Sequence, residues 1–287
     1  MRIRKLLRVR FVVDPFTEQE KIMAELTPMM QKYMETKEQY KDCILFYRLG
    51  DFYEMFFDDA LVASRELEIT LTGKSCGLEE RAPMCGIPYH AVEGYLSKLV
   101  SRGYKVAICE QVEDPKLAKG LVKREVIRVV TPGTNLNVQS LEAGKNNYLL
   151  SIAYTPDGIG ISAADVTTGD YYVTEVEDLK KLNDELMKYE PSEIICNEAF
   201  LVSGFDVNDL KSRLHISVNA LESHMFDDDG CRRILMKHFK VNTLIGLGVE
   251  EFPTGLLAAG SLLQYLYDTQ KTDLEHFTHI SPYLTSK

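Results

Sequence analysis

The sequence lacks several patterns that would assign a function directly. Its six cysteines lie far apart and form no C-x-x-C pair, which argues against a zinc site or a dithiol redox motif. In a chain of 287 residues the even number does not indicate a disulfide framework, so reduced thiols are expected. No apolar run reaches the roughly 18 residues that cross a bilayer, so we expect no membrane association.

Nucleotide-binding patterns are imitated but incomplete. Residues 73–75 resemble the end of a phosphate-binding P-loop, yet Glu68 occupies the position of that motif's first glycine. Residues 158–163 have the glycine spacing of a dinucleotide fingerprint, but we expect them inside a hairpin rather than between a strand and a helix. The sequence therefore predicts no cofactor site, no metal site and no catalytic residue in this chain.

The charge pattern allows two interpretations. The net charge of −10 argues weakly against nucleic-acid binding when it is taken alone. Residues 116–128, however, contain five basic residues and one acid, a local net charge of +4. Such a basic stripe can contact phosphates, and it can equally be a solvated surface.

The length predicts about two domains. Residues 1–22 alternate basic and apolar side chains without a small-residue cleavage site, and we interpret them as a disordered or foreign extension. Residues 135–147 are polar and without periodicity, which predicts a linker. The fold class is therefore α/β, with one α/β domain at 23–134 and a second at 148–250. In the last segment, 251–287, an amphipathic helix is expected from Thr254 to about Thr269.

The first domain is organised around residues 43–57, CILFYRLGDFYEMFF. Residues 43–49 predict a strand, and Gly50-Asp51 interrupts it. A helical pattern then begins at Phe52, with Asp51 and Glu54 spaced as the N-cap and N3 residues of a capping box. In the ordinary interpretation Phe52 is a core aromatic. The alternative is an exposed aromatic wedge with a carboxylate two residues away, which can enter and kink a DNA base step.

In the remainder of the first domain we predict a helix from Pro28 to about Tyr40, a second helix and three strands. The strands are expected at 68–72, 104–111 and 122–134, and a helix begins after Pro88 and ends near Gly103. Strict alternation along the last strand places Arg124 and Arg128 on one face, which would suit an edge that faces phosphates.

The second domain predicts an antiparallel meander of strands at 148–154, 159–166 and 171–176. Asp178 and Asp227 can cap the helices that follow them, and short strands are expected at 193–196 and 215–218. A meander followed by a helix resembles an RNase H-like sheet, on which Asp165 and Asp170 could join a two-metal nuclease site. No third or fourth carboxylate stands at a recognisable position.

The residues on either side of Phe52-Tyr53-Glu54 favour the exposed wedge over the core aromatic. Residues 46–56, together with 24–29 (AELTPM) and 83–90 (PMCGIPYH), resemble the bacterial MutS family of DNA mismatch-recognition proteins. The resemblance covers about 23–283. It implies a mixed-sheet mismatch-recognition domain and an RNase H-like connector domain without nuclease chemistry. It also implies that residues 251–287 begin a truncated domain of lever or core helices, so that the chain would be an N-terminal fragment.

The resemblance also implies roles for individual residues. Phe52 would stack on the mispaired or unpaired base from the minor groove, and Glu54 would form a hydrogen bond with that base. Lys74 and Arg124 would contact the DNA near the mismatch, and Met84 would lie close to the wedge. Arg128 is added to this set from strand alternation alone.

The implied partners are double-stranded DNA with a mismatch or a small insertion/deletion loop, a second MutS copy in a homodimer, and the repair protein MutL. ATP and Mg²⁺ would belong to a C-terminal domain that this chain lacks, and the protein would be cytoplasmic and associated with the nucleoid. Two alternatives remain: an RNase H-like metal-dependent nuclease, and a connector module that binds only proteins.

Overall fold

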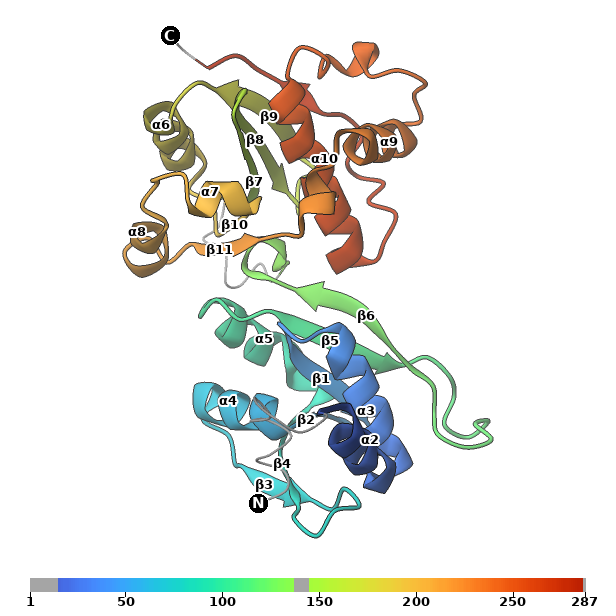
Figure 1. Ribbon diagram of the computed structural model, residues 1–287. Helices are drawn as coiled ribbons and strands as arrows, with labels where there is room; N and C mark the ends of the chain where they lie inside the picture. The colour runs from blue at the N-terminus through green and yellow to red at the C-terminus, as the bar shows by residue number, and fades with distance from the viewer. Residues whose placement is uncertain (1–14, 137–144, 286–287) are drawn as a thin grey trace. The chain divides into compact units, whose positions relative to one another are not determined.

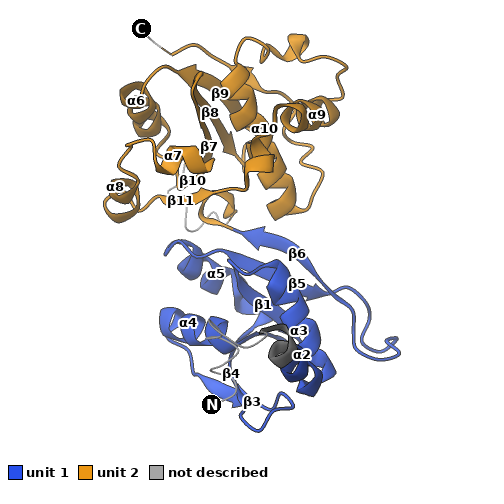
Figure 2. Ribbon diagram, viewed as in Figure 1, with its two compact units in different colours: residues 1–130 blue, residues 131–287 orange. Residues whose placement is uncertain are grey.

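The computed structural model describes residues 15–136 and 145–285. The chain divides into two compact units, residues 1–130 and 131–287 (Figure 2). Each unit contains a six-stranded mixed sheet covered by helices, so the α/β fold class is confirmed. The boundary at 130/131 lies before the linker predicted at 135–147, of which 137–144 fall outside the described residues.

The first sheet has the strand order β3-β4-β2-β1-β5-β6 (Figure 1). Its strands are β1 Ile44–Leu49, β2 Phe52–Phe56, β3 Thr72–Lys74, β4 Ala82–Pro88, β5 Val106–Gln111 and β6 Arg124–Val130. β1 runs parallel to β5, and the other neighbours are antiparallel.

Helices cover both faces of this sheet. They are α2 Pro15–Glu25, α3 Pro28–Gln39, α4 Phe57–Leu67 and α5 Val92–Val100, the last preceded by the 3₁₀ turn η1 Tyr89–Ala91. α4 and α5 pack with Tyr53 and Met55 of β2 in one core cluster, whereas α2 and α3 pack with Phe56 in another (Figure 1). Successive side chains of β2 therefore point to opposite faces, as in any strand. Of the predicted extension 1–22, residues 15–22 form most of α2, and 1–14 fall outside the described residues.

The helix predicted from Phe52 is wrong for its first five residues. Residues 52–56 form β2, which pairs with β1 across the two-residue turn Gly50-Asp51, with Leu49 opposite Phe52. Gly50 has φ +60°, and a positive φ at the first turn residue is typical of tight hairpins. The capping box of Asp51 and Glu54 therefore does not exist, because α4 begins only at Phe57.

Two further expectations for the first unit fail. The strand predicted at 68–72 is displaced, because Glu68 ends α4 in the left-handed conformation (φ +59°) and β3 begins only at Thr72. A β-bulge in the β5–β6 pair places Ile108 opposite Arg128 and Cys109 opposite Val126. The extra residue reverses the alternation, so Arg124 and Arg128 lie on opposite faces rather than on one.

The second sheet has the order β11-β10-β7-β8-β9-β12. Its strands are β7 Tyr148–Thr155, β8 Gly158–Asp165, β9 Tyr171–Val176, β10 Glu193–Cys196, β11 Ser217–Ala220 and β12 Ser281–Pro282. The antiparallel meander β7-β8-β9 is confirmed, and β10 runs parallel to both β7 and β11. The strand predicted at 215–218 begins at Ser217, because His215 has φ +57°.

Helices also cover both faces of the second sheet. They are α6 Leu179–Tyr189, α7 Glu198–Leu201, α8 Val207–Ser212, α9 Asp228–Phe239 and α10 Pro253–Gln270, with 3₁₀ turns η2 Pro132–Thr134, η3 Ser223–Phe226 and η4 Ile245–Leu247. α6 to α8 share one core cluster with the sheet, and α9 and α10 share the other. The predicted caps are confirmed: Asp178 accepts from the Lys181 amide and Asp227 from the Gly230 amide, both at 2.8 Å.

The long helix α10 belongs to the second unit. A Cβ atom on Gly160 of β8 would lie only 2.0 Å from the Thr254 carbonyl oxygen, so the helix backbone rests directly on the strand. Ser151 and Ser261 also join β7 to α10 through a buried hydrogen bond of 2.9 Å. The structure therefore differs from the expectation that residues 251–287 begin a separate helical domain, because this helix forms part of the second unit's core.

Candidate nucleic-acid interface

Phe52 is the exposed aromatic residue of the first sheet. The residue is 47% exposed, whereas the next residue, Tyr53, is buried. Phe52, Glu54 and Phe56 share one face of β2, because strand side chains alternate. Phe56, at the far end of that face, lies under α3 with its ring 4.9 Å from the Tyr33 ring. The face is thus covered at one end and open at the end that carries Phe52.

Glu54 lies on the open face beside Phe52 and forms an ion pair. Its Oε2 atom is 2.6 Å from the Nζ atom of Lys74, which ends the edge strand β3. The Glu54 side chain is 15% exposed and that of Lys74 is 34% exposed. The structure therefore brings together Phe52, Glu54 and Lys74, which were predicted to act together.

Gly86, which sequence reasoning missed, lies opposite Glu54 on β4. A Cβ atom there would meet Glu54 Cγ at 3.6 Å and Phe52 Cδ1 at 3.8 Å. Because glycine has no side chain, the surface between the aromatic ring and the carboxylate stays unfilled. Met84 shares this face but lies opposite Phe56, one side-chain step further from Phe52.

The two predicted arginines lie in different surroundings. The Nε atom of Arg124 donates to the Arg48 carbonyl at 2.7 Å, and its guanidinium lies 5.3 Å from the Tyr47 ring centroid. Tyr47 is the β1 partner of Glu54, so Arg124 lies on the sheet face that carries Phe52 and Glu54, which we call the wedge face. Arg128 is on the other face, where its buried Nε has no hydrogen-bond partner among the described residues. Burial lowers the pKa of this guanidinium.

A group of side chains on the opposite face holds the hairpin; we call Arg48, Tyr53, Tyr89 and Glu110 the hairpin brace. The Nε atom of Arg48 donates to the Gly50 carbonyl at 2.6 Å, within the turn that precedes Phe52. Its Nη1 atom is 3.3 Å from Glu110 Oε1, and its guanidinium lies 3.7 Å from the Tyr89 ring centroid.

Tyrosines complete the brace. The Tyr53 hydroxyl donates to Glu110, and the Tyr89 amide donates to the Asp51 carbonyl at 3.0 Å. Burial and the neighbouring Glu110 raise the pKa of Tyr53 above its usual value, which keeps this hydroxyl protonated. The sequence gives one weak signal for the brace: an arginine within an otherwise apolar strand needs a partner on its own face.

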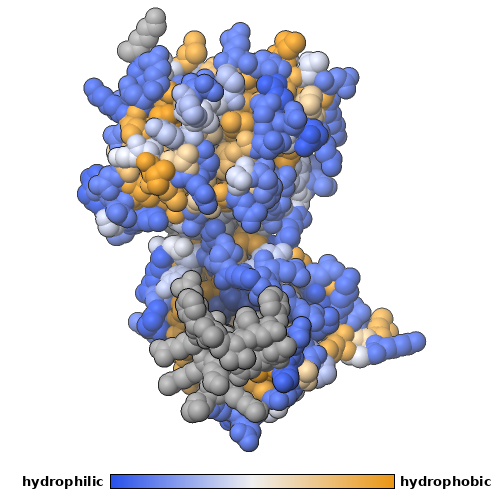
Figure 3. All heavy atoms as spheres, in the orientation of Figure 1, coloured by the Kyte–Doolittle hydropathy of each residue, from blue (hydrophilic) through white to orange (hydrophobic). Residues whose placement is uncertain are grey.

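The basic stripe at 116–128 is partly a loop with mixed side chains. In the β5–β6 loop, Leu117 is 79% exposed and Leu121 is also exposed, between lysines. Figure 3 shows hydrophilic and hydrophobic residues interspersed on this protruding loop, which Figure 1 traces away from the sheet. Lys123 pairs with Glu125 at 2.6 Å. Because Arg124 and Arg128 lie in β6, the loop itself carries fewer basic residues than the composition of 116–128 indicates.

The carboxylates considered for a nuclease site have structural partners. Asp165 is fully buried and accepts from the Asn147 amide at 3.1 Å and the Thr167 amide at 2.8 Å. Asp170 accepts from the Asn146 side chain at 3.2 Å. Within residues 15–136 and 145–285, no three His, Cys, Asp or Glu side chains gather as a metal site would require. These carboxylates stabilise the turn between β8 and β9.

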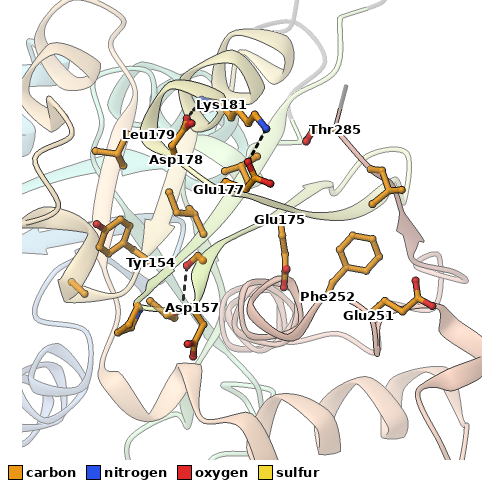
Figure 4. A pocket seen from close by; sticks show the side chains of 17 residues that line it. Tyr154, Asp157, Glu175, Glu177, Asp178, Leu179, Lys181, Glu251, Phe252 and Thr285 are labelled. Carbon is orange, nitrogen blue, oxygen red and sulfur yellow. Dashed lines mark hydrogen bonds and ion pairs between the residues drawn. The ribbon is translucent and has the colours of Figure 1, made fainter. Parts of the chain in front are cut away.

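An acidic cavity of about 940 Å³ opens on the second unit, beside β9 and the beginnings of α6 and α10 (Figure 4). Its carboxylates also stabilise local structure. Glu175 accepts from the Thr254 amide at 2.6 Å at the beginning of α10, and Glu177 pairs with Lys181 at 3.1 Å. Asp178 is the cap of α6. Helix capping and pairing thus account for these three acids.

No described helix combines the length and apolar character needed to cross a membrane.

Comparisons with known proteins agree with the fold of each unit. The family model for MutS domain I matches residues 27–139, and that for MutS domain II matches residues 147–280. The second match includes α10, which agrees with the packing of this helix on the second sheet.

Curated relatives share extensive identity with the chain. A protein of Lachnoclostridium phytofermentans is 66% identical over 265 residues, which are 92% of this chain and 28% of that relative. Proteins of Ruminiclostridium cellulolyticum and Acetivibrio thermocellus are each 52% identical, over 91% of the chain and 30% of their own length. All three are named DNA mismatch repair protein MutS, and the chain spans less than a third of each. The two domain matches and this degree of identity show that the chain belongs to the MutS family.

Proposed function

We propose that the first unit recognises mispaired or unpaired bases in duplex DNA, as the recognition step of DNA mismatch repair. Phe52 would enter the weakened base step from the minor groove and stack on the mispaired base, and Glu54 would form a hydrogen bond with that base. The observation that carries the proposal is the exposed Phe52 ring on the same open strand face as Glu54, in a member of the MutS family.

The energetics of the base step explain the selectivity. A mismatched step pairs and stacks poorly, so opening it costs less than the few kcal/mol that a matched step requires. Stacking on an aromatic ring returns about 1–3 kcal/mol per base. The difference between matched and mismatched DNA then arises largely from deformability, which is indirect readout. Glu54 adds selectivity rather than affinity, because a carboxylate is repelled by phosphates.

Other residues of the wedge face have supporting roles in this proposal. Lys74 and Arg124 would lie near the DNA beside the mismatch, and Met84 would line the same strand face further from the wedge, opposite Phe56. Arg128 is not included, because the bulge that reverses β6 removes the alternation argument on which its selection rested.

The remaining functions of the protein are proposed from the family. The recognition step in this chain needs no catalytic residue and no cofactor. ATP with Mg²⁺ and the second copy of a homodimer would act through other parts of the intact protein, by which we mean the full-length polypeptide that contains these 287 residues. The partner protein MutL would bind the same intact protein. A nuclease is not proposed, because Asp165 and Asp170 are engaged in a turn.

The proposal is tested by fluorescence anisotropy of the intact protein on a G·T duplex and on its matched twin. Phe52→Ala should abolish the preference for the mismatch, because the stacking contribution of about 1–3 kcal/mol is lost. Weak, salt-sensitive binding to both duplexes should survive, since it depends on phosphate contacts.

The matched control is Leu61→Ala, which removes an exposed apolar side chain from α4, outside the wedge face. This variant should keep the preference. A Phe52→Ala protein that weakens equally on matched and mismatched DNA would contradict the wedge.

A further inference from the structure

We propose that Lys74 acts on DNA binding through Glu54. In this proposal Lys74 is the counter-ion of the Glu54 carboxylate until a mispaired base engages it, and its main role is not a phosphate contact. The inference rests on the proposed function of Phe52 and Glu54, and it makes Lys74 a residue that determines specificity.

The sheet aims Lys74 at Glu54. The central strand β4 lies between β3, which carries Lys74, and β2, which carries Glu54. Lys74 pairs with Ala82 of β4, and Glu54 pairs with Gly86 of β4. The lysine side chain therefore crosses β4 to place Nζ 2.6 Å from Glu54 Oε2, and the same Nζ atom lies 5.7 Å from the Phe56 ring centroid. Gly86 has no side chain that would separate the carboxylate from Phe52. The ammonium group and the aromatic ring thus lie on different sides of Glu54.

The electrostatic environment makes this pairing matter for DNA. A duplex carries one negative charge per about 1.7 Å of its axis, so an unneutralised carboxylate beside it is repelled. On a matched duplex no base is available to Glu54, and the nearby Lys74 offsets its charge. At a mismatch the base forms a hydrogen bond with the carboxylate and takes over part of this role. Neutralisation by Lys74 should therefore matter more on matched DNA than on mismatched DNA.

A counter-ion and a phosphate contact predict different mutational behaviour. The contribution of a lysine that contacts a phosphate is independent of residue 54, and its loss lowers the salt slope by about 0.9. The contribution of a counter-ion disappears once its carboxylate is neutral. A double-mutant cycle separates the two, because coupling appears only when the two side chains act on each other.

The experiment measures the Kd of the intact protein for matched and G·T duplexes, with Lys74→Met, Glu54→Gln and both changes together. Lys74→Met alone should weaken matched-duplex binding roughly five-fold, which corresponds to about 1 kcal/mol of coupling. In the Glu54→Gln background the same change should have less than about a two-fold effect. On the G·T duplex the loss should be smaller, and Lys74→Arg should restore matched-duplex binding because it keeps the charge.

Equal losses in both backgrounds would overturn the inference in favour of a phosphate contact, and no loss in either background would overturn it as well. Lys74→Gln provides a second neutral variant if Lys74→Met reduces the folded fraction, which thermal unfolding reports. The inference fails separately from the proposed function: Phe52→Ala tests the wedge, and an additive cycle beside a functional wedge would reject only the role of Lys74.

Discussion

At the scale of single residues, Phe52 lies at a position that no other described element of the first unit buries. Its neighbours on β2 fill two different cores, yet its own ring is about half exposed at the open end of the strand. A large exposed apolar side chain beside a carboxylate and a glycine has the shape and polarity to hold a flat base with polar edges. Gly86 lies between the ring and the carboxylate, and a methyl group can be added at this residue without backbone strain.

Gly86→Ala should reduce mismatch binding without harming the fold. The nearest atom to the added methyl would be the Tyr53 carbonyl oxygen at 3.4 Å, which is ordinary contact, and alanine in a strand is not less stable than glycine. If the base lies over Gly86, the methyl group should lower the mismatch-to-match affinity ratio roughly tenfold, or about 1.4 kcal/mol. Anisotropy on the two duplexes measures the ratio.

Gly94→Ala is the control for this change, because a Cβ atom at Gly94 meets nothing within 4 Å. A ratio that stays at its original value in Gly86→Ala would show that the base does not occupy the space between Phe52 and Glu54.

At the scale of elements, the β1–β2 hairpin presents Phe52 and the brace behind it holds the turn. Arg48 links the Gly50 carbonyl to Glu110, and Tyr53 shares that carboxylate. Both members of the Arg48–Glu110 pair are largely shielded, with side-chain exposures of 17% and 20%. Removing one partner from a shielded pair leaves the other charge poorly compensated.

Arg48→Met should therefore lower the free energy of unfolding of the first unit by about 2–3 kcal/mol. Urea denaturation followed by tyrosine fluorescence measures this loss. Arg65→Met is the control, because the Arg65 side chain is 69% exposed in its pair with Glu66, and such a surface pair contributes about 0–1 kcal/mol. Similar effects of the two substitutions would mean that the brace has no special role.

Local sequence predicted which elements form better than it predicted how they pair. The meander, the caps Asp178 and Asp227, and the helices α5, α6, α9 and α10 follow from turn residues and apolar spacing, which act over short separations. Residues 52–56 fit a helical period as well as a strand. Their strand is selected by pairing with β4, some thirty residues away along the chain, and no local pattern reports that pairing.

The features of the site that the sequence did not predict also depend on pairing between strands that are distant in the sequence. Arg128 changes face because of a bulge that depends on the register with β5, and the Lys74–Glu54 pair spans a whole strand. Phe52, Glu54, Lys74 and Arg124 were placed on one interface through family resemblance, and the fold brings them to one face. Their contacts with DNA remain predictions.

At the scale of the whole molecule, each unit has its own sheet and its own cores, so their stabilities can be perturbed separately. The second unit depends on the close approach of α10 to β8 at Gly160, where any side chain would collide with the backbone of Thr254. This glycine allows the helix to complete the core of the unit.

Gly160→Ala should thus destabilise the second unit by about 3 kcal/mol or more, because overpacking against backbone forces the helix away. Hydrogen exchange of β7 to β9 should rise while that of β1 and β2 stays unchanged. Gly246→Ala, in the same unit, meets nothing within 4 Å and should be nearly neutral. Unchanged exchange in the Gly160→Ala protein would contradict the packing of α10 on the sheet.

The central claim is that the Phe52 ring enters a weakly stacked base step and bends the duplex there. The most direct measurement is the energy transfer between dyes at the two ends of a G·T duplex saturated with the intact protein, because saturation separates bending from affinity. The unaltered protein should bring the ends of the mismatched duplex closer together, and a Phe52→Ala protein at full occupancy should leave that duplex nearly straight. A duplex bent equally by both proteins would contradict the account.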